Sequence, residues 1–286
     1  MKKFAAAIAA VGVLCVGAFL YLDHARGGII GFTMKRALLG NDGSPARAEV
    51  NGISMYYETY GFGPPVLLLH GDFATVESMH HQIRALAESY LVIVPDRRAH
   101  GRTTDADGVA LSYSLMAADM VALLDTLEIE KADVVGWSGG GMDGIEMAIR
   151  YPDRVGRLVT YGSSFHPDGL EPSSLAMLEP DNPSLSQVRS FYESLAPDPD
   201  RWPVYLGKMS EMWRTQPELT VADLGTIAAP TLIMVGEHDM VLPAHTEELA
   251  ASIADSKLVI FGGQDHFAPL MAPEMVNREI LAFMEE

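Results

Sequence analysis

Short runs of apolar residues recur along the chain, and each run ends at a glycine, an acidic residue or another turn-forming residue. Uninterrupted runs of this length are typical of strands buried on both faces of a parallel sheet. A further segment, 53–60, has β-type content and follows Asn51-Gly52, a dipeptide that favours a tight hairpin. The predicted buried strands are 65–71, 90–96, 132–137, 155–161, 231–236 and 257–261.

Segments with apolar residues at helical spacing lie between these runs. In 114–127 the leucine and methionine side chains share one side, and Ser112 or Ser114 can cap the first turn. Strands that alternate with helices predict right-handed βαβ units and therefore an α/β fold with a mostly parallel sheet. The other predicted helices are 78–89, 142–151, 243–253 and 273–284.

Residues 163–222 interrupt this alternation. The segment is rich in proline and carries short helical pieces with many aromatic and methionine side chains. An insertion of this kind between sheet strands predicts a helical cap over a binding site. A structural excursion with no role in binding is the alternative.

The first 22 residues predict a targeting segment. Lys2 and Lys3 precede residues 4–22, which contain no charged residue. This is typical of a signal peptide or of an uncleaved membrane anchor. The small residues at 16–18 would allow a signal peptidase to cut there. Both place the folded part outside the cytoplasm, either exported to the periplasm or beyond, or anchored in the membrane. We interpret 23–46 as a linker and 47–286 as one folded domain.

The net charge of −18 argues against a nucleic-acid partner and against adhesion to anionic lipid, so membrane contact is expected only through the N-terminal segment. Cys15 is the single cysteine of the sequence, which excludes a disulfide framework and a thiolate zinc site. The pair His80-His81 has no third partner at ligand spacing. We therefore expect no metal and no organic cofactor; the sequence leaves the oligomeric state open.

The five residues Gly136-Trp137-Ser138-Gly139-Gly140 carry the most specific chemical signal. They follow a predicted strand and precede a predicted helix, which is the strand–turn–helix setting of a G-x-S-x-G nucleophile elbow. A sharp turn holds the serine in a strained conformation with its hydroxyl clear of the sheet, and glycines are needed on both sides. Ser138 is therefore a candidate nucleophile, with an ordinary turn serine as the alternative.

A serine hydroxyl needs a base to remove its proton, and the base needs an acid to orient it. Asp239 and His266 follow the last two predicted strands, and the carboxyl ends of parallel strands meet at one edge of the sheet. Glu237 competes with Asp239 for the role of the acid. His238 and His245 compete with His266 for the role of the base.

From about Arg47 to its end, the chain resembles the α/β-hydrolase family. The resemblance implies a mostly parallel eight-stranded sheet with helices on both faces and an inserted helical cap. The matching motifs are His70-Gly71 and the segments 96–103, 136–140, 236–239 and 262–266.

The same resemblance implies the residue roles. Ser138 is the expected nucleophile, His266 the general base and then acid, and Asp239 the group that holds the imidazole. The oxyanion hole is expected from the backbone N–H groups of Asp72 and Gly139, with Gly136, Trp137 and Gly140 completing the elbow.

Three features depart from the pattern, one of which is Ala99, at a position where many relatives have glycine. Asp72 places a carboxylate beside the expected oxyanion hole, and we expect its side chain to point outward. The elbow is similar to that of valacyclovir-hydrolase-like enzymes, which bind the ammonium group of an amino-acid ester through an acidic residue after the nucleophile. Gly139 occupies that position here, so this specificity is not expected.

These expectations favour a serine hydrolase that cleaves carboxylic esters of small to medium apolar substrates through an acyl-enzyme. Lactonase, C–C hydrolase, perhydrolase and aminopeptidase activities are alternatives on the same fold. A ligand-binding protein without turnover is the alternative from another class.

Overall fold

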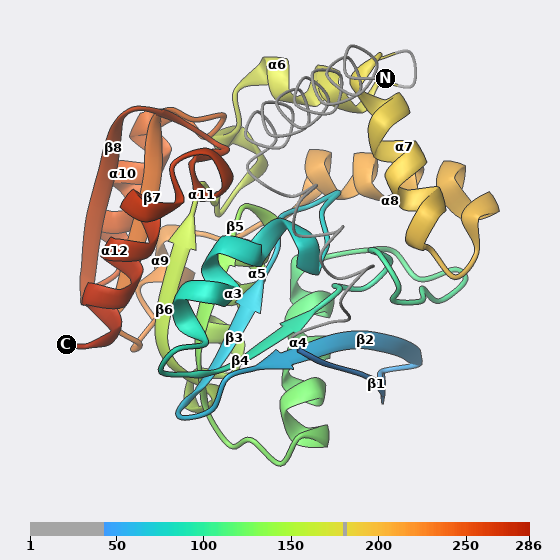
Figure 1. Cartoon of the computed structure of the whole chain (residues 1–286). Coiled ribbons are helices and arrows are strands. Elements are labelled where there is room, and N and C mark those ends of the chain that lie inside the picture. Colours follow the sequence, from blue (N-terminus) through green and yellow to red (C-terminus); the bar gives the residue numbers. More distant parts are fainter. Residues whose placement is uncertain (1–42, 180–181) are drawn as a thin grey trace, which may run out of the picture. The chain divides into compact units, whose positions relative to one another are not determined.

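The computed structural model describes residues 43–286 except 180 and 181 (Figure 1). The targeting segment predicted for residues 1–22 and most of the predicted linker lie outside the described residues. Within the described part, the strands form one eight-stranded sheet in the order β1-β2-β4-β3-β5-β6-β7-β8. Its strands are β1 (Ser44–Val50), β2 (Ile53–Tyr60), β3 (Pro65–Leu69), β4 (Leu91–Pro95), β5 (Ala132–Trp137), β6 (Val155–Tyr161), β7 (Thr231–His238) and β8 (Ser256–Asp265).

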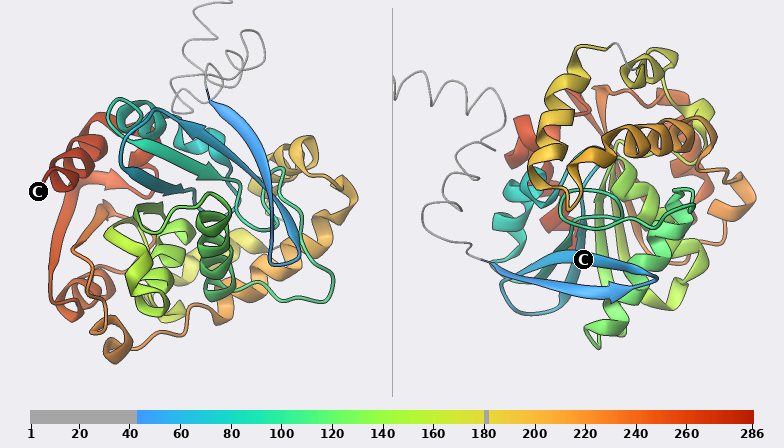
Figure 2. Two further views of the ribbon diagram at one scale, coloured as in Figure 1. Left: turned by 90° about the horizontal axis from the view of Figure 1, so that it is seen from below. Right: turned by 90° about the vertical axis from the view of Figure 1, so that its right-hand side faces the viewer.

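The sheet is parallel from β4 through β8, and the β1–β2 hairpin joins it antiparallel at one edge (Figure 2). Asn51 and Gly52 turn the hairpin, and both have positive φ angles, 44° and 78°. This is the backbone that a two-residue hairpin loop requires and that the Asn-Gly pair favours.

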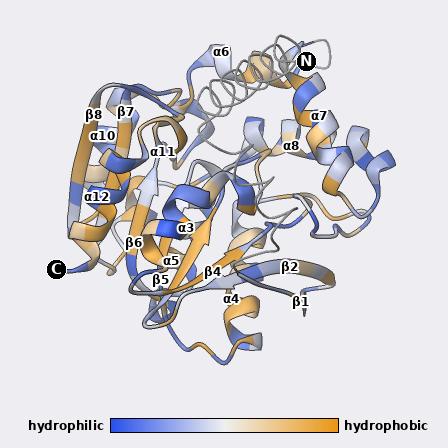
Figure 3. Cartoon of the chain, viewed as in Figure 1, coloured by the Kyte–Doolittle hydropathy of each residue, from blue (hydrophilic) through white to orange (hydrophobic). Residues whose placement is uncertain are grey.

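Helices cover both faces of the sheet, as predicted. Alternate residues of β3 explain why its sequence is apolar throughout: Leu67 and Leu69 pack on one face, and Val66 and Leu68 pack on the other. Figure 3 shows the central strands β3 and β4 coloured as hydrophobic. The first face is covered by α4 (Tyr113–Thr126), α5 (Gly139–Arg150), α9 (Val221–Leu224) and α10 (Pro243–Ser252), and the second by α3 (His80–Leu86), α11 (Ala268–Met271) and α12 (Pro273–Met284).

The predicted helical cap is present between β6 and β7. It contains α6 (Pro172–Leu175), α7 (Ser184–Leu195) and α8 (Trp202–Thr215), which lie toward the end of the sheet at which β6 points (Figure 1). Aromatic and methionine side chains of the cap form an apolar cluster with Ala99, Tyr113, Met116 and Met142 of the main domain. The cap is therefore packed onto the loops and helices that follow the strands.

The bounds of several elements differ from the sequence analysis. Residues 44–46, which we assigned to a linker, already pair with β2 as part of β1. The last two strands run further than predicted, to His238 and Asp265, across an irregularity in their pairing. The predicted helix 78–89 is a 3-10 turn, Val76–Met79, followed by α3, which ends at Leu86. No helix in the described part of the chain is long and apolar enough to cross a membrane.

Candidate active site

Ser138 lies in the turn between β5 and α5 with φ 55° and ψ −123°. This is an unfavourable region for a residue with a side chain, so the surroundings must hold it there. Its N–H donates to the Tyr161 carbonyl at 2.7 Å, and its own carbonyl accepts from the Ser163 hydroxyl at 2.9 Å. The strained serine is thus fixed on both sides by the end of β6.

The flanking glycines leave no room for side chains. A Cβ atom on Gly136 would lie 2.4 Å from the Gly140 carbonyl oxygen, and one on Gly140 would lie 2.4 Å from the Leu69 carbonyl oxygen. Such distances are far inside van der Waals contact. The glycine requirement of the elbow is therefore a packing requirement at two separate points.

His266 follows β8, and its Nδ1 lies 2.8 Å from Oδ1 of Asp239, which follows β7. The Trp137 indole N–H donates to the His266 carbonyl at 2.9 Å and fixes the backbone of that residue. The side chain of Asp239 is fully buried, and its Oδ2 has no hydrogen-bond partner among the described residues. The Asp239 carboxylate thus points at the His266 imidazole, which is the contact that its proposed role requires.

Ser138 and His266 both lie against the end of β6. The Ser138 N–H is hydrogen-bonded to the Tyr161 carbonyl, and Gly162, which follows Tyr161, lies directly against the His266 ring. Within the described residues the Ser138 hydroxyl makes no hydrogen bond. The hydrogen bond between a nucleophilic serine and its base is often long in a free enzyme and shortens when substrate binds.

The competing residues are placed elsewhere. Glu237 is exposed and accepts a hydrogen bond from the Gly263 backbone N–H at 2.7 Å. His238 is exposed at the end of β7. His245 accepts from the Phe165 N–H at 3.1 Å and stacks on that ring at 3.9 Å. The geometry therefore favours Asp239 and His266 over these alternatives.

The loop after β3 lies against the elbow. A Cβ atom on Gly71 would lie 3.2 Å from Cβ of Ser138, and one on Gly139 would lie 2.3 Å from Oδ1 of Asp72. No described group accepts a hydrogen bond from the Asp72 backbone N–H. Gly139 begins α5, and the first N–H groups of a helix have no partner within it. Among the described residues, the backbone N–H groups of Asp72 and Gly139 are thus two free donors in the segments that adjoin Ser138.

The expectation that the Asp72 side chain points outward is wrong. The side chain is 2% exposed and accepts hydrogen bonds from Arg97 Nη1 at 2.7 Å, Tyr113 Oη at 2.8 Å and Trp213 Nε1 at 2.8 Å. Burial is the largest single influence and would raise the pKa of Asp72, but the attraction of Arg97 and His100 and the hydrogen bonds from Arg97 and Tyr113 together outweigh it, and the pKa lies below its usual range. The carboxylate is ionised and matched by Arg97, so it is unavailable to a cationic substrate group.

A sequence model described as the alpha/beta hydrolase family matches residues 66–279. The chain belongs to this family. It is 29% identical to 2-hydroxy-6-oxo-2,4-heptadienoate hydrolase of Pseudomonas putida over 77% of this chain and 88% of that protein. It is 25% identical to serine hydrolase BPHL of Mus musculus over 87% of this chain and 89% of that protein. The enol-lactonase of Burkholderia xenovorans has the same fold, with a TM-score of 0.70 and 21% identity over 84% of this chain and all of that one.

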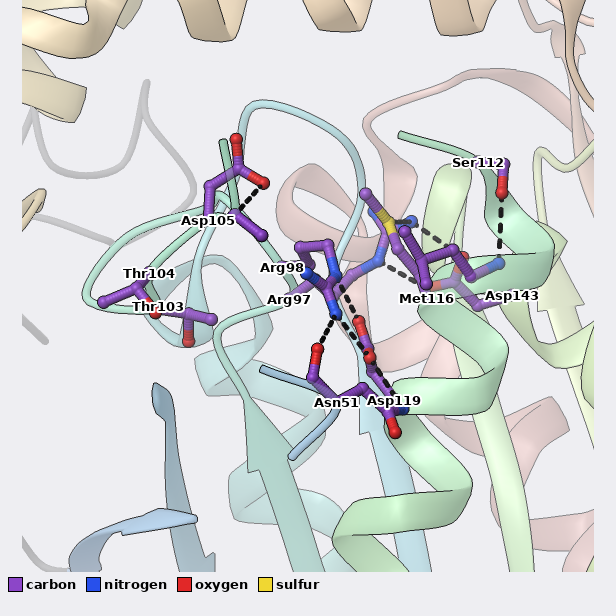
Figure 4. Close-up of polar contacts among 12 residues, drawn as sticks. Asn51, Arg97, Arg98, Thr103, Thr104, Asp105, Ser112, Met116, Asp119 and Asp143 are labelled. Carbon is purple, nitrogen blue, oxygen red and sulfur yellow. Dashed lines mark hydrogen bonds and ion pairs between the residues drawn. The ribbon is translucent and has the colours of Figure 1, made fainter. Parts of the chain in front are cut away.

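Arg97 occupies the centre of the polar network in this alpha/beta hydrolase. It is fully buried and holds Asp143 of α5 with two hydrogen bonds, from Nε at 2.6 Å and from Nη2 at 2.9 Å (Figure 4). The neighbouring Arg98 holds Asp119 of α4 in the same way, at 2.6 and 2.8 Å. Two planar guanidinium forks thus join the loop after β4 to the two helices on one face.

The sequence analysis did not assign a role to Arg97 or Asp143. One signal could have found Asp143: it lies in the helix that follows the elbow, which is expected to be buried. A buried carboxylate requires a charged partner, because an unpaired ion in the interior is very costly. The sequence contains no indication that this partner is Arg97, 46 positions earlier in the chain.

Two buried histidines near Arg97 are kept neutral. Burial and the adjacent Arg97 charge lower the pKa of His100 to about 4. Burial, His100 and Arg97 also hold the pKa of His70 well below its usual value. The Arg97 N–H donates to His70 Nε2 at 3.0 Å, so Nδ1 carries the proton and donates to the Gly71 carbonyl at 2.7 Å. His70 therefore holds the loop that carries Asp72.

Proposed function

We propose that this alpha/beta hydrolase cleaves carboxylic esters of small to medium apolar substrates through an acyl-enzyme formed on Ser138. The hydrolase class follows from the family. The main support for the ester proposal is the strained Ser138 beside the buried Asp239–His266 pair. This arrangement is the one that acyl transfer to a serine requires.

Each group then has one role. Ser138 Oγ attacks the ester carbonyl while His266 Nε2 takes its proton, and Asp239 Oδ1 accepts the Nδ1–H so that Nε2 remains the basic nitrogen. The negative oxygen of the tetrahedral intermediate is bound by the N–H groups of Asp72 and Gly139. One such donor contributes about 3–4 kcal/mol to transition-state stabilisation.

The carbon–oxygen bond to the alcohol then breaks, and His266 gives the alcohol the proton. A water molecule, which His266 deprotonates, attacks the acyl-enzyme. The bond to Ser138 Oγ then breaks, His266 returns the proton to Oγ, and the acid is released. Every proton passes through one imidazole, and no other group needs to titrate.

The lining of the cap supports an apolar substrate. The Phe73 ring, directly after Asp72, contacts Tyr205 and Trp213 of α8 edge-on, with ring centres 5.6 and 5.8 Å apart. An apolar acyl or alcohol chain is matched to such a surface, which offers little to a charged group.

The engagement of Arg97 also favours an ester over a carboxylate-bearing substrate. The relative from P. putida is named for a dienoate, which carries a carboxylate. Arg97, next to Gly139, is fully engaged with Asp72 and Asp143 and is buried. It cannot bind a substrate carboxylate without breaking an internal ion pair.

The test is hydrolysis of a p-nitrophenyl ester series, from acetate to palmitate, by the full-length protein beside Ser138→Ala. We expect turnover that is highest at one chain length and absent in the variant. If no ester is turned over while a fluorophosphonate still labels Ser138, the ester proposal fails and another acyl substrate is indicated. If Ser138 is not labelled, the serine-hydrolase mechanism itself fails.

A further inference from the structure

The Asp72 carboxylate joins three elements that are distant in the sequence. Its Oδ1 accepts from Arg97 in the loop after β4, and its Oδ2 accepts from Tyr113 of α4 and from Trp213 of the cap helix α8. The side chain is almost completely buried, so water does not replace a lost partner at low cost. The backbone of the same residue carries one of the two proposed oxyanion donors.

Arg97 extends this link to the other donor. Its Nη1 contacts Asp72 Oδ1 and lies 3.4 Å from the His70 carbonyl oxygen. Its Nη2 donates to the Gly139 carbonyl at 3.1 Å. One rigid guanidinium therefore contacts both loops from which the N–H groups of Asp72 and Gly139 project.

Trp213 is the contribution of the cap to this network. Its indole N–H lies 2.8 Å from Asp72 Oδ2, and its ring packs edge-on against Phe73, the next residue along the loop. Phe73 has a φ angle of 59°, which a residue with a side chain adopts only when neighbours hold it. The cap helix thus contacts the two side chains that set the course of the loop.

From these contacts we infer that Trp213 is a positioning residue, which makes the oxyanion hole dependent on the seating of the cap. When α8 is in place, the indole completes the hydrogen bonds of Asp72, and Arg97 holds the Asp72 and Gly139 peptides in register. When the cap lifts, Oδ2 loses a donor and the loop loses its contact on Phe73. This inference rests on the proposed function, because it concerns the hole that this function uses.

The test compares Trp213→Phe with Trp202→Phe in the full-length protein. Phenylalanine keeps an aromatic ring but removes the indole N–H. Trp202 is a matched control: it lies on the same helix, is similarly buried, and packs on Tyr192 and Tyr205 without contacting Asp72. A general loosening of the cap would affect both variants alike.

The first readout is the second-order rate of Ser138 labelling by a fluorophosphonate. Ser138 Oγ attacks phosphorus, the P–F bond breaks, fluoride leaves and the hydroxyl proton passes to His266. Negative charge develops on the phosphoryl oxygen, so the rate reports on the oxyanion hole without a known substrate. We expect Trp213→Phe to be labelled roughly tenfold more slowly than the wild type, a smaller loss than deleting an oxyanion donor would cause. We expect Trp202→Phe to be labelled near the wild-type rate.

The second readout separates positioning from substrate contact. A positioning role lowers kcat for p-nitrophenyl acetate, the shortest ester of the series, and leaves KM unchanged. Equal labelling rates in the wild type and Trp213→Phe would overturn the inference, as would equal losses in both variants. So would an effect confined to KM for long esters, which would make Trp213 a wall of the substrate pocket. Failure of the wild type to be labelled would instead refute the proposed function, and the inference with it.

Discussion

A single methyl group at Gly162 provides a direct test of how the proposed acid and base are held. Gly162 has a φ angle of 60°, and a Cβ atom there would lie 2.7 Å from His266 Nδ1 and 3.0 Å from Asp239 Oδ2. Ordinary van der Waals contact begins at 3.4 Å. In Gly162→Ala the imidazole must therefore move by several tenths of an ångström, away from a hydrogen bond that is now 2.8 Å long.

Two losses follow, and they can be separated. Alanine in a left-handed conformation costs about 1–2 kcal/mol of stability relative to glycine. A misplacement of catalytic groups approaching 1 Å costs about a hundredfold in rate, so kcat/KM is expected to fall by roughly that factor. The control is Gly108→Ala, because Gly108 has a φ angle of 71° and a Cβ atom there would meet nothing within 4 Å.

Urea unfolding and ester hydrolysis are measured on both variants. We expect both to lose a similar amount of stability and only Gly162→Ala to lose activity. If Gly162→Ala keeps the activity of Gly108→Ala, the packing of Gly162 against His266 does not set catalytic geometry, and the reasoning is refuted.

Three further predictions concern single polar groups. Asp239→Asn is expected to lower kcat/KM roughly ten-thousandfold with a normal fold by circular dichroism, because the amide favours the wrong imidazole tautomer; activity near the wild-type value would reject Asp239 as the acid. Glu237→Gln is expected to leave kcat unchanged, since Glu237 only accepts the Gly263 N–H on the surface, and a large loss would restore it as a candidate. Burial and Arg97 lower the pKa of His100 to about 4, so the unfolded chain binds a proton more readily, and stability is lost as the pH falls from about 6.5 to about 4. In urea titrations the wild type should lose up to about 3 kcal/mol more than His100→Gln across this range, whereas equal losses would show that His100 is not held neutral.

In the His100 experiment, the quantity to compare is the loss of stability in the wild type and in His100→Gln. Burial raises the pKa of Asp143 to about 7 against the opposing pull of Arg97. The folded protein therefore binds this proton more tightly than the unfolded chain, and stability from Asp143 falls as the pH rises toward 7. This contribution is present in both proteins and cancels in the comparison.

The parts of the fold that could be predicted from the sequence are those with an unambiguous pattern. The strands β5 and β6 match their predicted bounds, because apolar residues make up most of each strand. β1 did not stand out, because it is an edge strand that contains a proline and is largely exposed. β8 was predicted too short, because Gly262-Gly263 resembles a turn, although pairing resumes between His238 and Asp265 beyond the irregularity.

The same distinction holds for the candidate site, where residues marked by a local pattern could be predicted and residues defined by distant contacts could not. Ser138, Asp239 and His266 could be proposed as a candidate site because each follows a strand, and parallel topology brings the ends of strands together. The orientation of Asp72 could not, because its partners lie 25, 41 and 141 positions away and in three different elements. No local pattern records which distant donor a carboxylate meets, so the network around Arg97 is visible only in the structure.

The role of Ser138 is tested most directly by mass spectrometry of the full-length protein after reaction with a fluorophosphonate, followed by peptide mapping. The account predicts one phosphonyl group per chain, located on Ser138, and no adduct in Ser138→Ala. An unmodified protein, or an adduct on another serine that persists in Ser138→Ala, would contradict it.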